Sequence, residues 1–138
     1  MKKTILFICS HNSARSQMAE ALSNYFFSDK LEAYSAGIEN RGVHPLTIEV
    51  LKEFGIDTSK LYSKTIDKFK NINFDFVVTV CDSAKEKCPF FPGKIVIHKS
   101  FLDPSSIEGS GEERKKAFRK VRDEIKKWLE EFIREYEI

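Results

Sequence analysis

The chain has 138 residues, 41% of them hydrophobic and 32% charged, which is the composition of an ordinary globular protein and suits one domain with one core. Its formal net charge of +2, without an arginine-rich run, gives no argument for nucleic-acid binding, and no apolar run approaches the roughly 18 residues of a membrane span. The basic start Met1-Lys2-Lys3 imitates a signal peptide, but the apolar stretch after it is too short, so we expect a cytoplasmic protein with one domain, residues 1–138, and reduced cysteines.

The first predicted elements are a strand at Ile5–Ile8, which is short, apolar and rich in β-branched residues, and a helix over about Ser16–Ser28. The loop Cys9–Arg15 therefore connects the carboxyl end of a strand to the start of a helix, where open α/β sheets bind ligands. Unpaired backbone N–H groups and the positive end of the helix dipole gather there and favour an oxyanion. The predicted oxyanion-binding residues are Ser10, His11, Asn12, Ser13, Ala14 and Arg15.

Four residues of this region carry a chemical argument. A thiol at an anion-binding helix N-terminus is commonly a thiolate near neutral pH, which would make Cys9 a nucleophile. Arg15 offers a planar fork to a tetrahedral oxyanion, and Ser16 can donate a hydrogen bond to the sulfur of Cys9. Asn12 can bond backbone groups and fix the turns of the loop. Cys9 alone could equally be an inert buried cysteine, but the spacing Cys9-x5-Arg15-Ser16 favours catalysis.

The later elements alternate between strand and helix patterns. In chain order we expect a strand at Leu31–Ser35, a helix from Pro45 to Phe54 ended by Gly55, a short helix capped by Ser63 and running to Lys70, a strand at Phe74–Val80, a polar segment Asp82–Cys88 that is helical or irregular, a strand at Lys94–His98, a loop from Leu102 to near Gly111 and a helix from Glu112 to Tyr136. This alternation predicts an α/β fold with a parallel sheet covered by helices on both faces.

Cys81 stands at the carboxyl end of its predicted strand, as Cys9 does, and Cys88 follows after six residues. This spacing matches neither a zinc knuckle nor a C-x-x-C redox motif, and no histidine lies nearby at ligand spacing, so we expect no metal. Two interpretations stay open. The pair is either two unreactive thiols or a redox pair in a polar segment, bounded by proline and glycine, that opens to let the sulfurs meet.

Asp103 precedes a proline, and alone this pair favours a turn. Its loop is predicted to leave the same edge of the sheet as the oxyanion loop, where its carboxyl group could act as a general acid that protonates an oxygen leaving the oxyanion. The three histidines carry no predicted catalytic role: His11 contributes a loop N–H or faces solvent, His44 is structural, and His98 is satisfied in the core.

Five motifs are spread along the chain: Cys9-x5-Arg15-Ser16, Ser35-Ala36-Gly37, Gly42-Val43-His44-Pro45, Val78-Thr79-Val80-Cys81 and Asp103-Pro104. Together they resemble those of the low-molecular-weight tyrosine phosphatases, and equally those of the arsenate reductases built on the same fold. The resemblance covers nearly the whole chain. It implies a four-stranded parallel sheet in the order 2-1-3-4, and it favours the general-acid interpretation of Asp103.

The other two cysteines distinguish the arsenate reductases from the phosphatases, because Cys81 and Cys88 match the relay cysteines of thioredoxin-coupled arsenate reductases. The resemblance implies that Cys9 attacks arsenate, that Cys81 attacks Cys9 to form a Cys9–Cys81 disulfide and expel arsenite, and that Cys88 moves the disulfide to Cys81–Cys88. A thioredoxin-like protein then reduces that bond. Ser105-Ser106-Ile107 stand where tyrosine phosphatases have aromatic residues, which favours a small inorganic oxyanion.

We therefore expect an arsenate reductase that acts as a monomer with thioredoxin and needs no organic cofactor, since no Gly-rich dinucleotide fingerprint is present. Two alternatives stay open. One is a protein tyrosine phosphatase, which needs Cys9, Arg15 and Asp103 but neither of the other cysteines. The other is a non-enzymatic oxyanion or redox sensor that uses the same pocket.

Some arsenate reductases of this kind bind potassium beneath the loop through an Asn, a Glu, a Ser and an Asp. The first three match Asn12, Glu20 and Ser35, but Lys64 stands at the position aligned with the Asp. A lysine cannot ligate a cation, although its ammonium can take a cation's place. We therefore expect Lys64 to pair with Glu20 and to support the loop without a metal; the alternative is a solvated surface lysine.

Overall fold

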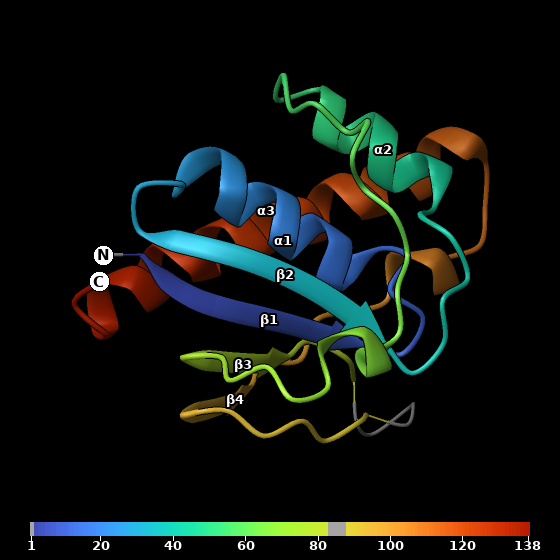
Figure 1. Ribbon diagram of the computed structural model, residues 1–138. Coiled ribbons are helices and arrows are strands. Elements are labelled where there is room, and N and C mark those ends of the chain that lie inside the picture. Colours follow the sequence, from blue (N-terminus) through green and yellow to red (C-terminus); the bar gives the residue numbers. More distant parts are fainter. Residues whose placement is uncertain (1, 83–87) are drawn as a thin grey trace.

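The computed structural model describes residues 2–82 and 88–138 and is built around a four-stranded parallel sheet (Figure 1). The strands are β1 (Lys3–Cys9), β2 (Leu31–Gly37), β3 (Phe76–Thr79) and β4 (Ile95–His98). The helices are α1 (Arg15–Phe26), α2 (Pro45–Lys52) and α3 (Gly111–Glu135), with short 3₁₀ helices η1 (Ile66–Phe69) and η2 (Pro104–Ser106). The strand order β2-β1-β3-β4 confirms the predicted order 2-1-3-4.

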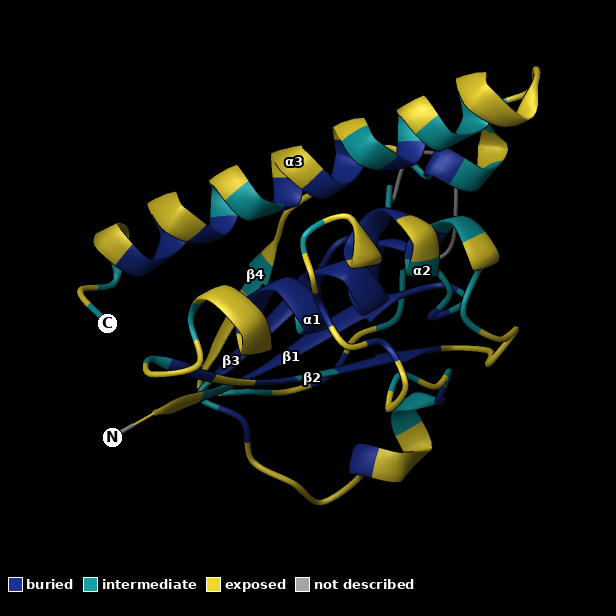
Figure 2. Ribbon diagram, turned by 90° about the horizontal axis from the view of Figure 1, so that it is seen from above, coloured by how far each residue is buried: buried dark blue, intermediate teal, exposed yellow. Residues whose placement is uncertain are grey.

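The two faces of the sheet are covered differently (Figure 2). The helices α1, α2 and α3 pack together on one face, and η1 lies with loops against the other. Along β1, Ile5 and Phe7 point into the helix-side core, Leu6 and Ile8 point into the other core, and all four are fully buried. A strand buried on both faces needs a continuous apolar run, which explains why this stretch has no polar residue.

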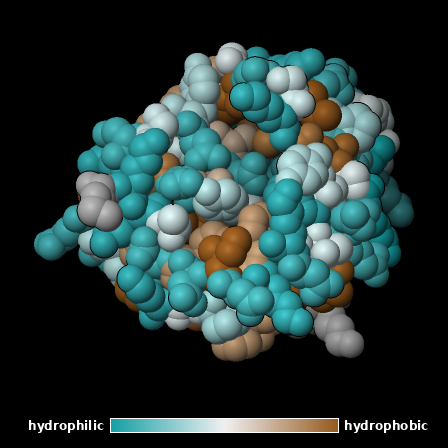
Figure 3. Space-filling model, viewed as in Figure 1, coloured by the Kyte–Doolittle hydropathy of each residue, from teal (hydrophilic) through white to brown (hydrophobic). Residues whose placement is uncertain are grey.

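The face of the molecule that carries η1 is mostly polar. Figure 3 shows the η1 side of the molecule as mostly hydrophilic, with apolar side chains in small groups. Within the described residues, no helix has both the length and the apolar character to cross a membrane.

The long helix α3 closes the helix-side core through one apolar stripe. It begins after Ser110, whose Oγ accepts a hydrogen bond from the backbone N–H of Glu113 at 3.2 Å. Burying one large apolar side chain contributes roughly 1.5–3 kcal/mol, so the stripe is a major part of the stability. Its members, each at most 1% exposed, are Phe118, Val121, Ile125, Leu129 and Phe132.

One predicted helix cap was wrong. The helix expected from Ser63 to Lys70 is a single 3₁₀ turn, η1, which follows Thr65 without a side-chain cap. The hydroxyl of Ser63 instead donates to the carbonyl oxygen of His11 at 3.2 Å. A serine hydroxyl serves a nearby loop carbonyl as readily as a helix end, and here the folded chain brings the loop within reach.

The predicted burial of His98 was also wrong. β4 is an edge strand with one neighbour, so His98 is exposed, and its Nδ1 makes a hydrogen bond with Oγ1 of Thr79 at 2.7 Å. The polar segment predicted between Asp82 and Cys88 falls, at positions 83–87, outside the described residues.

Candidate active site

The loop between β1 and α1 directs its carbonyl groups to the surrounding scaffold. The carbonyl oxygen of Ser10 accepts hydrogen bonds from the N–H groups of Ile38 and Glu39, at 3.0 and 3.1 Å, and that of Ser13 accepts from His44 at 3.0 Å. Every described peptide bond is trans, so the N–H of each following residue points the opposite way, toward the centre of the loop. The loop therefore forms a backbone cradle for an anion. The other loop carbonyls that accept hydrogen bonds are those of His11, Asn12 and Ala14.

The turn of this loop depends on Asn12, which is fully buried and has a φ of 50°, in the left-handed region that asparagine tolerates. Its Oδ1 accepts hydrogen bonds from the backbone N–H of Lys64 at 2.8 Å and from Nε2 of Gln17 at 2.9 Å. Its Nδ2 donates to the hydroxyls of Ser16 and Ser35, at 2.8 and 3.0 Å. With two bonds at each end, the amide can take only one orientation.

Cys9 ends β1, is 2% exposed and has a free thiol. Its Sγ lies 2.9 Å from the Oγ of the fully buried Ser16. The Oγ of Ser16 also accepts a hydrogen bond from Asn12, and its own proton is available to the sulfur. Ser16 is therefore placed to donate a hydrogen bond to the sulfur of Cys9.

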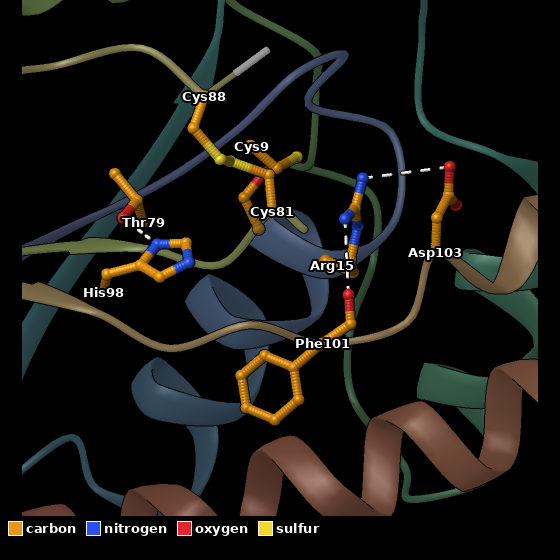
Figure 4. Close-up of a disulfide and its surroundings, with 9 residues drawn as sticks. Cys9, Arg15, Thr79, Cys81, Cys88, His98, Phe101 and Asp103 are labelled. Atoms are coloured by element: carbon orange, nitrogen blue, oxygen red, sulfur yellow. Dashed lines mark hydrogen bonds and ion pairs between the residues drawn. A yellow bond between two sulfur atoms is a disulfide. The ribbon is translucent and has the colours of Figure 1, made fainter. Parts of the chain in front are cut away.

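Arg15 begins α1 and is only 3% exposed. Its Nη1 donates to the carbonyl oxygen of Phe101 at 3.4 Å, and its Nη2 lies 3.8 Å from Oδ2 of Asp103 (Figure 4). A buried guanidinium held in this way presents a fixed fork beside the loop.

Asp103 forms the turn that its Asp-Pro pair predicts. Its Oδ1 accepts hydrogen bonds from the backbone N–H and the hydroxyl of Ser105, at 3.0 and 2.7 Å, and so caps η2. Its other carboxylate oxygen faces Arg15. The turn thus positions a carboxyl group at the mouth of the loop.

A cavity of about 310 Å³ opens over this loop. His44 caps α2 there, because its Nδ1 accepts a hydrogen bond from the N–H of Leu46 at 3.0 Å. Burial lowers the pKa of His44, with a smaller contribution from Arg114, and this favours the neutral ring that the cap requires. The described lining residues include no Phe, Tyr or Trp; they are His11, Ser13, Arg41, Gly42, Val43, His44, Pro45, Asp103 and Ser105.

A disulfide joins Cys81 and Cys88, whose Cα atoms are 6.0 Å apart (Figure 4). Cys81 follows β3 and is fully buried, in the same core as Cys9. The two strands are paired up to this point, since the N–H of Val80 donates to the carbonyl oxygen of Ile8 at 2.8 Å. The disulfide therefore lies beside the oxyanion loop, and the interpretation of two unreactive thiols is wrong for this pair.

Lys64 lies beneath the loop and is only 7% exposed, so the alternative of a solvated surface lysine is wrong. Its Nζ donates to the carbonyl oxygen of Tyr62 at 2.9 Å and lies 3.4 Å from both Oε1 of Glu20 and Oγ of Ser35. The ion pair predicted between Lys64 and Glu20 is present.

Two contributors gave no signal in the sequence. Nε2 of Gln17 donates to the backbone carbonyl of Asn12 at 3.2 Å and to that of Tyr62 at 2.9 Å, which ties the loop to the η1 side. The carbonyl of Phe101 positions Arg15. Glutamine early in a helix is common, and a backbone carbonyl belongs to every residue, so only the folded chain identifies these contacts.

Comparisons with known proteins agree with this geometry. Residues 4–137 match the family described as low molecular weight phosphotyrosine protein phosphatase. The arsenate reductase of Halalkalibacterium halodurans is 46% identical over 132 residues, covering 95% of each chain. A solved arsenate reductase in the phosphate binding state is 30% identical, with a TM-score of 0.81 over 98% of each chain. The thioredoxin-dependent arsenate reductase of Corynebacterium glutamicum is 27% identical, with a TM-score of 0.66, over 94% of this chain and 61% of that one.

Proposed function

This chain belongs to the low molecular weight phosphotyrosine protein phosphatase family, and we infer that within it the chain is an arsenate reductase. The observation that carries this conclusion is the Cys81–Cys88 disulfide beside the free thiol of Cys9. Hydrolysis of a phosphate ester needs one thiol and no disulfide. Reduction of arsenate to arsenite consumes two electrons, which a pair of thiols supplies when it becomes a disulfide.

The first step that we propose joins Cys9 to arsenic. The thiolate of Cys9 attacks the arsenic of arsenate while Arg15 and the loop N–H groups hold the arsenate oxygens. Asp103 gives a proton to the oxygen that leaves, so the step yields a Cys9-bound arsenic(V) species and water. The hydrogen bond from Ser16 holds the attacking sulfur in place.

The reduction itself belongs to the second step. The thiolate of Cys81 attacks the sulfur of Cys9, the sulfur–arsenic bond breaks, and its electron pair stays on arsenic, which leaves as arsenite. The thiolate of Cys88 then attacks Cys81 in the resulting Cys9–Cys81 disulfide, forms Cys81–Cys88 and releases Cys9 as a thiolate. The observed pairing, with Cys9 free, fits the end of this sequence.

We assign the reductant to a thioredoxin-like dithiol protein. Cys81 is fully buried and Cys88 is partly exposed, so an external thiolate reaches the sulfur of Cys88 first and displaces Cys81. A relative described as thioredoxin-dependent supports this assignment. Such reductants keep thiols reduced in the cytoplasm, where we expect this protein to act.

A tyrosine phosphatase is the second candidate, because the family match and the set Cys9, Arg15 and Asp103 suit it. The cavity argues against an aromatic substrate, since its described lining offers no Phe, Tyr or Trp to flank a phenyl ring.

The deciding experiment compares two reactions of the same preparation. Arsenate is supplied with thioredoxin, thioredoxin reductase and NADPH, and NADPH consumption is followed together with arsenite formation; hydrolysis of an aryl phosphate is measured in parallel. We expect arsenite to form in step with NADPH oxidation and the aryl phosphate to be a poorer substrate. Rapid aryl phosphate hydrolysis without arsenite formation would instead establish the phosphatase.

A further inference from the structure

We propose that Lys64 is a built-in counter-ion which takes the place of a metal cation beneath the oxyanion loop, and that it acts as a positioning residue for the sulfur of Cys9. The inference rests on the proposed role of Cys9 as the nucleophile. Its test therefore measures the sulfur directly, apart from arsenate turnover.

The ammonium group of Lys64 occupies a built site. It lies 3.4 Å from the Glu20 carboxylate and from the Ser35 hydroxyl, 2.9 Å from the carbonyl oxygen of Tyr62, and 4.7 Å from the centre of the Tyr62 ring. The Glu20 side chain is only 15% exposed. A lysine is rarely buried unless its charge is paired, so these contacts are the reason that it can remain inside.

The same contacts occupy the oxygen atoms that would otherwise coordinate a potassium ion. The resemblance to potassium-binding arsenate reductases would place the ion between Asn12, Glu20 and Ser35. Here the Oδ1 of Asn12 is occupied by two N–H donors, and the ammonium of Lys64 contacts both Glu20 and Ser35. A second cation at that point would face the lysine charge directly, so the described residues do not fit a metal.

A chain of hydrogen bonds leads from this ion pair to the nucleophile. The hydroxyl of Ser35 donates to Oε1 of Glu20 at 2.7 Å, so its oxygen is left to accept from Nδ2 of Asn12. The other N–H of that amide donates to Ser16, whose own proton goes to Cys9. Each donor direction is set by the link before it, beginning at the carboxylate that the lysine neutralises.

Removal of the lysine charge should therefore change the hydrogen bond made to the sulfur of Cys9. Without Lys64, the buried carboxylate of Glu20 loses its counter-charge, and a proton taken from water restores neutrality. A protonated Glu20 can donate to the oxygen of Ser35, so the proton of Ser35 is released from Glu20 and can turn toward Nδ2 of Asn12, in place of the lone pair that Nδ2 needs. Nδ2 of Asn12 then loses one of its two acceptors, while Oδ1 keeps its bonds to Gln17 and to the backbone N–H at position 64. The bond from Asn12 to Ser16, and with it the Ser16 proton aimed at Cys9, is therefore held less firmly.

The experiment uses the full chain with Cys81→Ser and Cys88→Ser, in which Cys9 is the one thiol left of the three. The rate of alkylation of Cys9 by iodoacetamide is measured against pH. Lys64→Met should move the midpoint of this profile upward by about one pH unit. An unmoved midpoint in a Lys64→Met protein that keeps its circular dichroism spectrum would overturn the proposal.

Three further variants separate charge from packing. Glu20→Gln with Lys64→Met should return the midpoint toward that of the parent, because a neutral amide still accepts from Ser35. Ser35→Ala breaks the chain without stranding a charge, so it should shift the midpoint upward even if Lys64→Met fails to fold. Lys68→Met is the matched control, since Lys68 is exposed and its Nζ lies 4.5 Å from the Tyr62 ring centre. The proposed chain of hydrogen bonds would be refuted if the midpoint of the double variant were as high as that of Lys64→Met. It would also be refuted if the midpoint of Ser35→Ala equalled that of the parent.

A separate experiment tests whether Lys64 takes the place of a bound potassium ion. The melting temperature is measured in potassium chloride and in tetramethylammonium chloride at equal ionic strength. The parent should melt at the same temperature in both salts, and Lys64→Asp should be stabilised by potassium alone. A parent that potassium stabilises, or a Lys64→Asp protein that it does not, would contradict the replacement of a metal by Lys64.

Discussion

The three cysteines differ in exposure, and this difference decides which partner each sulfur can meet. Cys9 is 2% exposed at the end of β1, Cys81 is fully buried and Cys88 is partly exposed. A buried thiol can exchange only with a neighbouring sulfur, whereas a partly exposed one can be reached by a second protein. In the proposed relay, the buried Cys81 therefore passes the disulfide from Cys9 to the partly exposed Cys88.

The first prediction separates nucleophile from relay. Cys9→Ser, Cys81→Ser and Cys88→Ser should each lower thioredoxin-driven arsenate turnover by about three orders of magnitude or more, because each removes a required sulfur. Of the three, Cys9→Ser alone should abolish any hydrolysis of an aryl phosphate. Arsenite formation measures the first effect and release of the phenol the second. Full thioredoxin-coupled turnover by Cys88→Ser would disprove the relay.

The second prediction concerns the fork of Arg15. Arg15→Lys keeps the charge but removes the paired N–H groups, so arsenate turnover should fall about 10²–10³-fold. The same change at Arg134, an exposed residue in the last turn of α3, should have little effect. Steady-state kinetics of both variants provide the comparison, and equal activity of Arg15→Lys and the parent would exclude a bidentate role.

At the scale of elements, the strands could be predicted because a buried strand requires a run of apolar residues, which is visible in the sequence. β1 and β3 pair with neighbours on both sides, and their apolar runs mark them. The carboxyl ends of parallel strands meet at one edge, which is why Cys9 and Cys81 come together from distant positions. Local polar signals were less reliable, as the hydroxyl of Ser63 shows, because a loop that folds over it competes for the same hydrogen bond.

The third prediction concerns the contact between the end of β2 and the oxyanion loop. A Cβ at Gly37 would lie 2.8 Å from the backbone N of Asn12 and 2.9 Å from the carbonyl oxygen of Ser10. Neither backbone atom can move without displacing the loop, so Gly37→Ala should cost about 1–3 kcal/mol of unfolding free energy and lower arsenate turnover.

The matched control for this change is Gly111→Ala, where a Cβ meets nothing within 4 Å. Urea denaturation and turnover of both proteins test the pair. If Gly37→Ala were as stable and as active as Gly111→Ala, the close contact would not constrain the loop.

At the scale of the whole molecule, the part of the site that could be predicted is the part that depends on side-chain identity and spacing. Cys9 and Arg15 carry a recognisable spacing, and Lys64 was identified by its departure from a pattern. The carbonyls of Phe101 and Tyr62 could not be predicted, because tertiary packing alone selects which backbone groups meet a side chain. The burial that makes Lys64 an internal cation is likewise a property of the fold.

The fourth prediction concerns stability against acid. Glu53, at the end of α2, forms ion pairs with Arg119 and Arg122 of α3. Hydrogen bonding by Arg119, and then by Arg122, lowers the pKa of Glu53 from 4.5 to about 2. A carboxyl group with a lowered folded pKa stabilises the protein above its unfolded pKa, and this contribution is lost as the pH falls through its folded pKa. Glu53→Gln should therefore be less stable than the parent at pH 7, and the difference should disappear between pH 4.5 and about 2.

Thermal unfolding at several pH values measures this difference. Glu130→Gln is the control, because Glu130 pairs with Lys126 on the exposed side of α3 and surface pairs contribute little. A Glu53→Gln deficit that persists unchanged to pH 2 would mean that charge is not its cause.

The start of β1 at Lys3 and the C-terminal end of the chain lie at the edge of the sheet opposite the loop that follows Cys9 (Figure 1). The N–H of Lys3 donates to the carbonyl oxygen of Lys30 at 2.9 Å, and Nζ of Lys30 donates to the carbonyl oxygen of Ile138 at 3.1 Å. A molecule immobilised on an electrode or a bead through either terminus would consequently turn its sulfurs toward the liquid. Protein attached through its N-terminus and protein attached through its C-terminus should therefore be equally active, which would suit a device that detects arsenate in water.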